Sequence, residues 1–420
     1  MGARQIVTCR GPARARRGRD LGDVAVLANA AVLIENGRIA AVGPYRELRT
    51  AHAAAVTEEV QGVLFPGFVD CHTHAVFGHP RLDDHARRAR GESYKTIAAL
   101  GGGILESVRD VRARREAELV DVTRARIQAL QAHGTTTIEV KSGYGLDPAT
   151  ELKQLQVVRA LQATERATLV PTFLGAHAVP PEFQDRRAAY VRLVCEEMIP
   201  AVARARLAAA CDVFCEPGVF DVAETRTILD AARRAGLGLK LHADELDGSG
   251  GAELAVALGA LSADHLAGIS DAGVEALAPS DTVAVLLPAT MVFLGIGRQA
   301  PARRLVTAGA AVALATDFNP GSSPTVSLPL VMALGVSQLG LSHEAALLAV
   351  TVNAAAALGL AGDRGQIAPG MRADLVACGV AEWREVAYWM GANLVTAVWT
   401  GGSACPPSRG SVSLGLHVKA

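Results

Sequence analysis

The sequence lacks a strong net charge. Its 41 Lys and Arg residues balance 42 Asp and Glu residues, which leaves a formal net charge of -1. No global field therefore attracts nucleic acid or an anionic membrane, and an acidic substrate must be bound by specific residues. The one basic run, five arginines among Gly, Pro and Ala in residues 10–19, is predicted to be a solvated N-terminal loop rather than a nucleic-acid-binding arm.

The sequence also lacks the cysteine pattern of a disulfide framework. It contains seven cysteines, an odd number, and no two of them have Cys-x-x-Cys spacing. This pattern favours reduced thiols in a cytoplasmic enzyme. No apolar segment follows the N-terminal arginines, so the sequence does not support a secretory signal.

One uncharged stretch, residues 345–362, is long enough to span a membrane. Its Thr351, its Asn353 and its many alanines instead favour a buried helix in a large soluble protein. We therefore expect neither a membrane nor a nucleic acid as partner. A homodimer is left open as the oligomeric state.

The composition is that of a compact protein, because 50% of the residues are hydrophobic and only 20% are charged. No internal repeat or low-complexity tract stands out. The length of 420 residues exceeds one ordinary domain, yet it suits one barrel of about 250 residues with a smaller module attached.

The chain from residue 67 onward alternates between short β-rich runs and helical segments, the pattern of a parallel sheet with helices outside it. One such helix is predicted over residues 116–132, where His133 and Gly134 form its end. Eight β/α units predict a TIM-like (β/α)₈ barrel in the α/β class. The eight predicted strands are residues 68–72, 136–141, 168–173, 212–215, 237–242, 261–265, 282–287 and 312–317.

Both ends of the chain are predicted to be β. Two apolar runs within residues 24–42 flank Asn36-Gly37, a strong signal for a hairpin turn. After a last helix at about residues 344–360, β-like segments recur near 365–367 and 373–376. We expect the ends to pair into one small β-sandwich-like domain. The predicted division is residues 1–66 and 363–420 for this domain and 67–362 for the barrel.

The candidate functional residues fall at the carboxyl ends of predicted barrel strands, where such barrels place their reacting groups. His72 and His74 are two residues apart, so on a strand they would point the same way. Imidazoles with a carboxylate suit one Zn²⁺ or Fe²⁺/Fe³⁺ ion per chain. The predicted ligands are His72, His74, His242 and Asp317. His265 is then an acid or base behind them, and Glu245 faces the same pocket.

These residues lie in segments that resemble the amidohydrolase superfamily and, within it, the imidazolonepropionase family. The superfamily resemblance rests on residues 70–74, 242–245, 263–265, 315–317 and 370–375. The closer resemblance rests on residues 76–78 leading to Arg81, 141–146, 172–177 and 318–323. It covers nearly the whole chain. It implies hydrolysis of the cyclic amide C–N bond of 4-imidazolone-5-propanoate to N-formimidoyl-L-glutamate, a step of histidine degradation.

The resemblance also implies roles for individual residues in this small-molecule site. Arg81 would bind the propanoate carboxylate through its planar guanidinium. Tyr144 and His177 would bind the ring and its polar atoms, and Glu245 an amide nitrogen. The remaining substrate-binding residues implied are Asn319, Gly321 and Ser322. Without the resemblance, Arg81 has the simpler interpretation of an ion pair with Asp83 or Asp84.

The expected chemistry is hydrolysis assisted by a metal, which makes a nucleophile of water at neutral pH. Asp317 would accept the proton, His265 would stabilise the oxyanion, and Glu245 or His265 would protonate the leaving nitrogen. Lys141 ends the second strand, whereas relatives that bridge two metals by a carboxylated lysine carry it on the fourth. We therefore expect one metal, with Lys141 as a structural ion pair or as a group behind the ligands.

Two other functions use much of the same residue set. A nucleobase deaminase would use His242, Glu245, His265 and Asp317 equally well, but a neutral base has no carboxylate for Arg81 to bind. A non-catalytic metal and ligand carrier needs no proton-transfer groups, so the presence of Glu245 and His265 argues against it.

Overall fold

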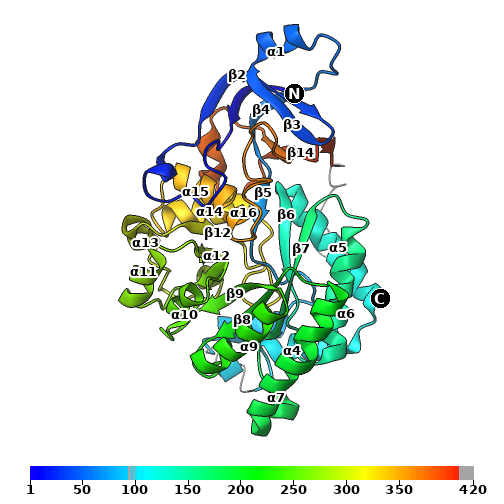
Figure 1. The fold of residues 1–420 in the computed structure, drawn as a ribbon, viewed down its shortest axis with the longest axis vertical. Coiled ribbons are helices and arrows are strands. Elements are labelled where there is room, and N and C mark those ends of the chain that lie inside the picture. The colour runs from blue at the N-terminus through cyan, green and yellow to red at the C-terminus, as the bar shows by residue number, and fades with distance from the viewer. Residues whose placement is uncertain (93–95, 98–99, 406–420) are drawn as a thin grey trace.

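The computed structural model describes residues 1–92, 96–97 and 100–405 (Figure 1). Within these residues the strands form two sheets, one of eight strands and one of seven. The eight-stranded sheet is parallel throughout and alternates with helices, whereas the seven-stranded sheet is mixed and is built from both chain ends. The predicted (β/α)₈ barrel with a β module from both termini is therefore confirmed.

Each barrel strand pairs in parallel with the next strand along the chain. All eight predicted strands are present, with ends that differ by a few residues. They are β5 (Phe68–Asp70), β6 (Thr135–Lys141), β7 (Thr168–Ala176), β8 (Ala210–Cys215), β9 (Gly238–Ala243), β10 (Ser262–His265), β11 (Val283–Leu286) and β12 (Val312–Leu314). A bridge between Thr73 and Phe318, just past β5 and β12, brings the first and last strands together.

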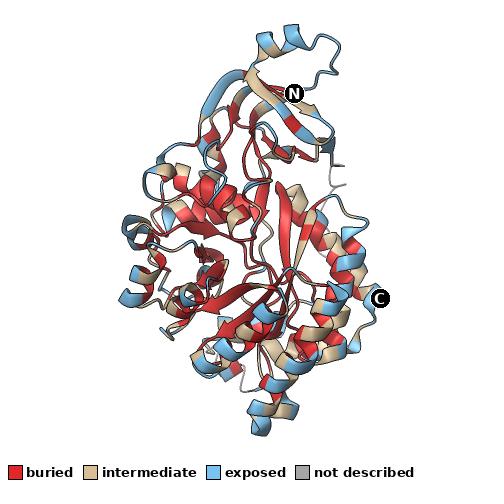
Figure 2. Cartoon of the chain, in the orientation of Figure 1, coloured by how far each residue is buried: buried red, intermediate tan, exposed pale blue. Residues whose placement is uncertain are grey.

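Helices surround the barrel and bury one face each, so their outer faces are exposed while the strands are buried (Figure 2). α5 begins and ends as predicted, and Gly134 after it has a φ of 92°. The helices are α2 (Leu82–Ala89), α4 (Ile104–Ala113), α5 (Glu116–Ala132), α6 (Pro148–Gln162), α7 (Arg187–Leu193), α8 (Ile199–Ala205), α9 (Val222–Arg234), α10 (Gly251–Ala257), α11 (Asp271–Leu277), α12 (Pro288–Phe293), α13 (Ala302–Ala308), α14 (Leu328–Ser337), α15 (His343–Ala349) and α16 (Val352–Ala356). Shorter turns are η1 (Gly18–Gly22), η2 (Pro181–Arg186), the π-turn η3 (Val194–Met198) and η4 (Trp383–Ala387).

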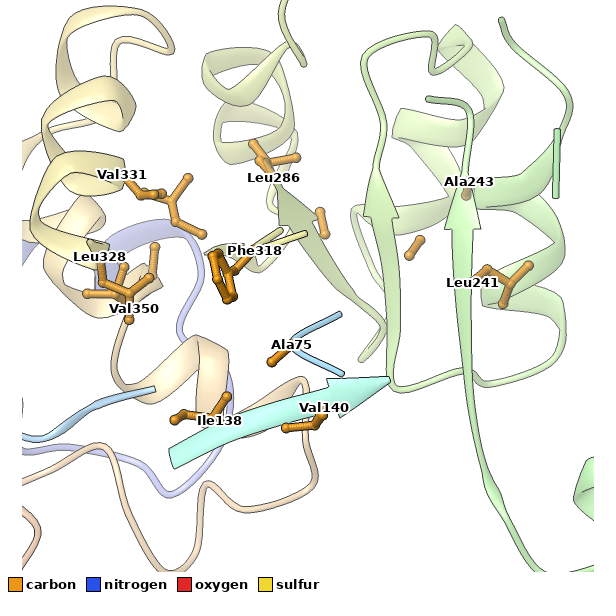
Figure 3. Close-up of a cluster of buried hydrophobic side chains, with 14 of the residues drawn as sticks. Ala75, Ile138, Val140, Leu241, Ala243, Leu286, Phe318, Leu328, Val331 and Val350 are labelled. Carbon is orange, nitrogen blue, oxygen red and sulfur yellow. The ribbon is translucent and has the colours of Figure 1, made fainter. Parts of the chain in front are cut away.

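Side chains alternate along the barrel strands between the interior and the helical layer. On β6, Ile138 and Val140 belong to the main apolar core, whereas Glu139 and Lys141 form ion pairs with residues of other strands. Figure 3 shows Ile138 and Val140 on β6 and Leu241 on β9 within this core. The interior-facing side of β6 is thus charged, whereas Val283 and Val285 of β11 belong to a second apolar cluster.

The terminal sheet joins segments more than 300 residues apart in the sequence. Its order is β15-β14-β13-β4-β1-β2-β3, and Val32 and Leu375 share one apolar core, as expected. Its strands are β1 (Gly2–Val7), β2 (Val26–Glu35), β3 (Arg38–Pro44), β4 (Glu59–Pro66), β13 (Leu375–Cys378), β14 (Val395–Thr400) and β15 (Ser403–Ala404), with α1 (Tyr45–Ala51) after β3. Asn36 and Gly37 form the predicted hairpin turn, with φ of 50° and 77°.

The prediction of a β segment at residues 365–367 is wrong. These residues lie in no strand, and Ile367 instead donates its backbone N–H to the Thr8 carbonyl. We propose residues 1–66, 67–362 and 363–420 as the division between the terminal β module and the barrel. The last part extends into residues 406–420, which lie outside the described residues.

The predicted single helix over residues 344–360 is also wrong, because the chain forms α15 and α16 with a break at Thr351. The backbone of Gly365 lies against Thr351, where an added Cβ would be 2.9 Å from the Thr351 carbonyl carbon. Asn353 donates to the Val312 carbonyl at 2.7 Å, which fixes α16 to β12. Across the described chain, no helix is both long and apolar enough to cross a membrane.

The arginine run is only partly a solvated loop. Arg16 is 2% exposed and donates to the carbonyls of Pro12 and Cys9, and its backbone N–H donates to Asn353 Oδ1. Arg17 pairs with Asp281 at 2.5 Å. Charge and composition could not reveal this packing, since it depends on contacts with residues more than 250 positions away.

Candidate metal centre and catalytic pocket

His72 and His74 lie just past the end of β5 rather than in a strand, so this detail of the prediction is wrong. The chain leaves regular pairing there because it contacts the segment after β12. Asp317 donates its N–H to the His72 carbonyl at 3.0 Å, and His74 donates to the Phe318 carbonyl at 2.9 Å. These bonds hold the ends of the first and last strands together and place both imidazoles at the barrel mouth.

Four of the predicted residues converge there. His74 Nε2 lies 3.3 Å from His72 Nε2 and 3.3 Å from His242 Nε2. Asp317 Oδ1 lies 3.5 Å from His72 Nε2 and 3.6 Å from His74 Nε2. All four side chains are buried, so these groups are shielded from bulk solvent.

The nitrogens that face one another carry lone pairs. The His72 Nδ1–H donates to Asp264 Oδ2 at 2.6 Å, which leaves Nε2 as an acceptor. His242 Nδ1 lies 3.1 Å from Asp212 Oδ2, an electrostatic contact that lacks hydrogen-bond geometry. Burial, and then the charge of Lys141, lowers the pKa of His72 well below its ordinary value. The Nε2 atoms of His72 and His74 both face Asp317 Oδ1, and this set of donor atoms suits a divalent cation.

Asp317 is held by a neighbouring hydroxyl. Thr290 Oγ1 donates to Asp317 Oδ2 at 2.7 Å, while Oδ1 faces the histidines. Burial raises the pKa of Asp317 to about 6, and the Thr290 hydrogen bond opposes this rise. Burial thus makes the carboxylate of Asp317 a stronger base than an exposed one, which suits a group that accepts a proton.

His265 and Glu245 lie beside this cluster and line the same cavity as His74, His242 and Asp317. His265 Nδ1 is 3.7 Å from Glu245 Oε1, which is too long for a hydrogen bond. Burial, followed by the charges of Asp317 and Glu216, raises the pKa of Glu245 well above its ordinary value. Glu245 therefore favours its protonated form and can donate a proton.

His177 and Tyr144 form one wall of the cavity. The ring of His177 stacks on His74 at a centroid distance of 5.2 Å, and Tyr144 lies 5.4 Å from His177. The His177 Nδ1–H donates to the Gly143 carbonyl at 2.9 Å, so Nε2 is an acceptor. Burial lowers the pKa of His177 to about 3, which keeps the ring neutral.

The loop that carries Tyr144 is fixed by the buried carboxylate of Glu151. It accepts backbone N–H bonds of 3.1, 2.8 and 2.9 Å from Gly143, Gly145 and Leu146. Gln154 accepts the Tyr144 N–H at 3.0 Å. Neither Glu151 nor Gln154 was predicted as a functional residue, since neither stands in a recognisable motif.

Arg81 is buried at the mouth of the barrel, only 5% exposed, and lines the same cavity. Its Nε is 3.8 Å from Asp84 Oδ2, and its Nη1 has no hydrogen-bond partner among the described residues. The ion-pair interpretation therefore leaves the guanidinium unsatisfied. A buried cation with free donors fits an anionic group of a ligand.

Gly321 does not line the cavity as described; it provides the space for Arg81. A Cβ at residue 321 would be 1.5 Å from Arg81 Nη2 and 1.9 Å from Arg81 Cζ. Asn319 shapes this turn, because its Oδ1 accepts the N–H groups of Gly321 and Ser322 at 2.8 and 2.7 Å. Asn319 and Ser322 both line the cavity.

Lys141 forms a structural ion pair, which was one of the two roles predicted for it. Its Nζ lies 2.9 Å from Glu139 Oε2 and 2.7 Å from Asp212 Oδ2. Burial alone would lower the pKa of Lys141, but Asp212 and Glu139 outweigh burial and raise it. The side chain is thus an ammonium between carboxylates. Asp212 was not predicted as a functional residue; it is the first residue of the predicted strand over residues 212–215 and stands among apolar residues.

Comparison with known proteins identifies the class of enzyme to which this fold and site belong. Residues 63–405 match the model of the amidohydrolase family, and residues 30–55 match the imidazolonepropionase-like composite domain of bacteria. An adenosine deaminase from Xanthomonas campestris with bound zinc has the same fold, with a TM-score of 0.65 over 96% of this chain and 91% of that one, at 19% identity. The barrel and its histidine–aspartate cluster are those of an amidohydrolase.

Curated relatives narrow the class further. An imidazolonepropionase from Symbiobacterium thermophilum is 47% identical over 95% of this chain and 94% of its own length. Another from Deinococcus deserti is 50% identical over 92% of this chain and 95% of its own length. The chain belongs to the imidazolonepropionase family.

Proposed function

We propose that this chain hydrolyses the cyclic amide C–N bond of 4-imidazolone-5-propanoate and releases N-formimidoyl-L-glutamate, a step of histidine degradation. The observation that carries the proposal is the buried guanidinium of Arg81, which lies in the same cavity as the histidine–aspartate cluster. Its Nε and Nη1 have no hydrogen-bond partner within residues 1–92, 96–97 and 100–405. A substrate that joins a hydrolysable ring to a carboxylate matches both features. The relatives named imidazolonepropionase support the same substrate.

We propose that His72, His74, His242 and Asp317 hold one divalent or trivalent ion, Zn²⁺ or Fe²⁺/Fe³⁺, per chain. The support is that His72, His74 and Asp317 form one group of possible metal ligands, and that His242 Nε2 lies 3.3 Å from His74 Nε2. When bound, such an ion polarises the ring carbonyl and lowers the pKa of a water towards about 7.

The substrate is oriented by residues on opposite sides of the cavity. Arg81 binds the propanoate carboxylate by charge-assisted hydrogen bonds. His177 and Tyr144 lie against the ring, and His177 presents Nε2 as an acceptor for a ring N–H. Ser322 and Asn319 line the side of the cavity that follows β12, and Gly321 keeps Arg81 in place.

The reaction adds one water across the ring amide. Asp317 accepts a proton from the attacking water, for which a pKa of about 6 is well matched. His265 hydrogen-bonds the carbonyl oxygen as negative charge develops on it. Glu245, which favours its protonated form, donates to the ring nitrogen as the C–N bond breaks. The proton held by Asp317 then returns Glu245 to its starting state, so atoms and charges balance.

The cytoplasmic location and the homodimer remain predictions. The support for the location is that the seven cysteines, all within the described residues, are free thiols. Gel filtration with light scattering would test the homodimer.

The test of the function is consumption of 4-imidazolone-5-propanoate by the purified chain, followed by its ultraviolet absorbance, with neutral nucleobases as comparison substrates. We expect turnover of the imidazolone only. Deamination of a nucleobase at a comparable rate, unaffected by Arg81→Ala, would favour a deaminase and contradict the proposal.

A further inference from the structure

The barrel interior beneath the histidine cluster holds an unusual charge arrangement. Two lysines, Lys141 on β6 and Lys240 on β9, are at most 1% exposed. Three carboxylates surround them, Glu139, Asp212 and Asp264, each 0% exposed. Placing five ionisable groups in a dry core is costly unless each is paired, so their positions are constrained by one another.

Asp212 connects Lys141 to one ring of the cluster. Its Oδ2 lies 2.7 Å from Lys141 Nζ and 3.1 Å from His242 Nδ1, and its Oδ1 accepts the His242 backbone N–H at 3.1 Å. The carboxylate therefore contacts His242 through both oxygens. Lys141 is the only side-chain cation within hydrogen-bond distance of this carboxylate in the described residues.

Asp264 connects the same interior to a second ring. Its Oδ2 accepts the His72 Nδ1–H at 2.6 Å and lies 3.7 Å from Lys141 Nζ. Lys141 thus stands between two carboxylates, and each of these holds one imidazole. If the ammonium were absent, the two carboxylates would repel each other and Asp212 would be free to turn away from His242.

We propose that Lys141 is a positioning residue for the metal centre: by holding Asp212 and Asp264 in place, it sets the orientation and tautomer of His242 and His72. The inference rests on the proposed function only through the metal site formed by these histidines. Lys141 does not touch the ion or the substrate. It acts through the carboxylates, whose loss in comparable sites weakens metal binding about 10- to 100-fold.

Lys240 provides a matched contrast within the same core. Its Nζ lies 3.6 Å from Glu139 and 3.8 Å from Asp264, and it donates to the carbonyls of Cys71 and Ala357 at 3.4 and 3.3 Å. It has the same charge and burial as Lys141, but among the described contacts it has none to Asp212. Both lysines reach Asp264, at 3.7 and 3.8 Å, so the contact with Asp212 is what distinguishes Lys141. A general need for positive charge in the core would make both lysines equally important, whereas positioning of His242 through Asp212 depends on Lys141.

The experiment compares Lys141→Met and Lys240→Met, since methionine preserves much of the volume and removes the ammonium. Each full-length variant is stripped of metal, checked for folding by near-ultraviolet circular dichroism, and titrated with Zn²⁺ against a chromophoric chelator. Co²⁺ is also added, because its visible spectrum reports ligand geometry. We expect Lys141→Met to raise the Zn²⁺ Kd about 10- to 100-fold and to alter the Co²⁺ spectrum. Lys240→Met should raise the Zn²⁺ Kd less than Lys141→Met does, because it leaves the contact between Lys141 and Asp212 in place.

The proposal is overturned if Lys141→Met binds Zn²⁺ with the wild-type Kd and spectrum, or if Lys240→Met weakens binding equally. If Lys141→Met does not fold, Asp212→Asn is titrated with Zn²⁺ instead, because the amide nitrogen of an asparagine at residue 212 cannot accept from His242 Nδ1. A 10- to 100-fold weaker Kd for Asp212→Asn supports the proposal, and an unchanged Kd overturns it. If the wild-type chain binds neither Zn²⁺ nor Co²⁺, the proposed metal centre is overturned as well. If it binds them tightly but does not hydrolyse the imidazolone, only the proposed substrate is overturned.

Discussion

Replacing Gly321 by alanine tests the role of Arg81 without removing its charge. The added Cβ would lie 1.5 Å from Arg81 Nη2, 1.9 Å from Cζ and 2.0 Å from Nε, all shorter than a van der Waals contact. The guanidinium is 5% exposed and cannot remain where it is. We expect Gly321→Ala to displace it from the cavity, and so to remove its hydrogen bonds to the propanoate.

The expected size follows from the bonds lost. A hydrogen bond to a charged group contributes about 1.5 to 3 kcal/mol, which corresponds to an increase in KM of about 10- to 150-fold. The carboxylate is bound in the ground state and the transition state alike, so kcat should change little. Initial rates over a range of substrate concentrations measure both constants. Gly362→Ala serves as the control, because a Cβ there would meet nothing within 4 Å.

A double-mutant cycle then separates this mechanism from a general disturbance of the loop. If Gly321→Ala acts by displacing Arg81, combining it with Arg81→Ala should raise KM no further than Arg81→Ala alone. An imidazolone with an uncharged side arm should be bound equally by the wild type and Gly321→Ala. Additive effects in the cycle, or an unchanged KM for Gly321→Ala, would refute the reasoning.

Three further predictions concern the metal and the proton-transfer groups. His265→Ala should lower kcat about 10²- to 10⁴-fold and retain the metal; loss of the metal, measured by elemental analysis, would instead make His265 a ligand. Elemental analysis of the wild type should find about one Zn or Fe per chain, and two tightly bound ions would contradict the single site. Chelation should abolish activity without unfolding the chain. Burial raises the pKa of Asp317 to about 6 and lowers the pKa of His72 and His74. The Zn²⁺ affinity of the metal-free chain should therefore be constant above about pH 7 and fall about tenfold per pH unit just below pH 6. A steeper fall would mean that a histidine takes up protons as well.

Local sequence determined the regular elements of this protein. The boundaries of α5 could be predicted because an apolar pattern ends at His133 and Gly134, and the turn at Asn36 and Gly37 because both residues adopt a positive φ readily. The positions of His72, His74, His242 and Asp317 followed from a general property of parallel barrels, in which the carboxyl ends of the strands meet at one mouth. These features depend on neighbouring residues or on topology alone.

Contacts between distant residues decided the rest. The chain between α15 and α16 packs against Gly365 at Thr351, and the backbone N–H of the buried Arg16 donates to Asn353, 337 positions away. The same holds for the site: Arg81 fits only because Gly321 lacks a Cβ, and Lys141 meets Asp212, 71 positions away, only when the barrel closes. A sequence pattern gives the residues that can take part in such contacts. Only the tertiary structure decides which of them become partners, because pairing buried charges requires distances and orientations that no single segment contains.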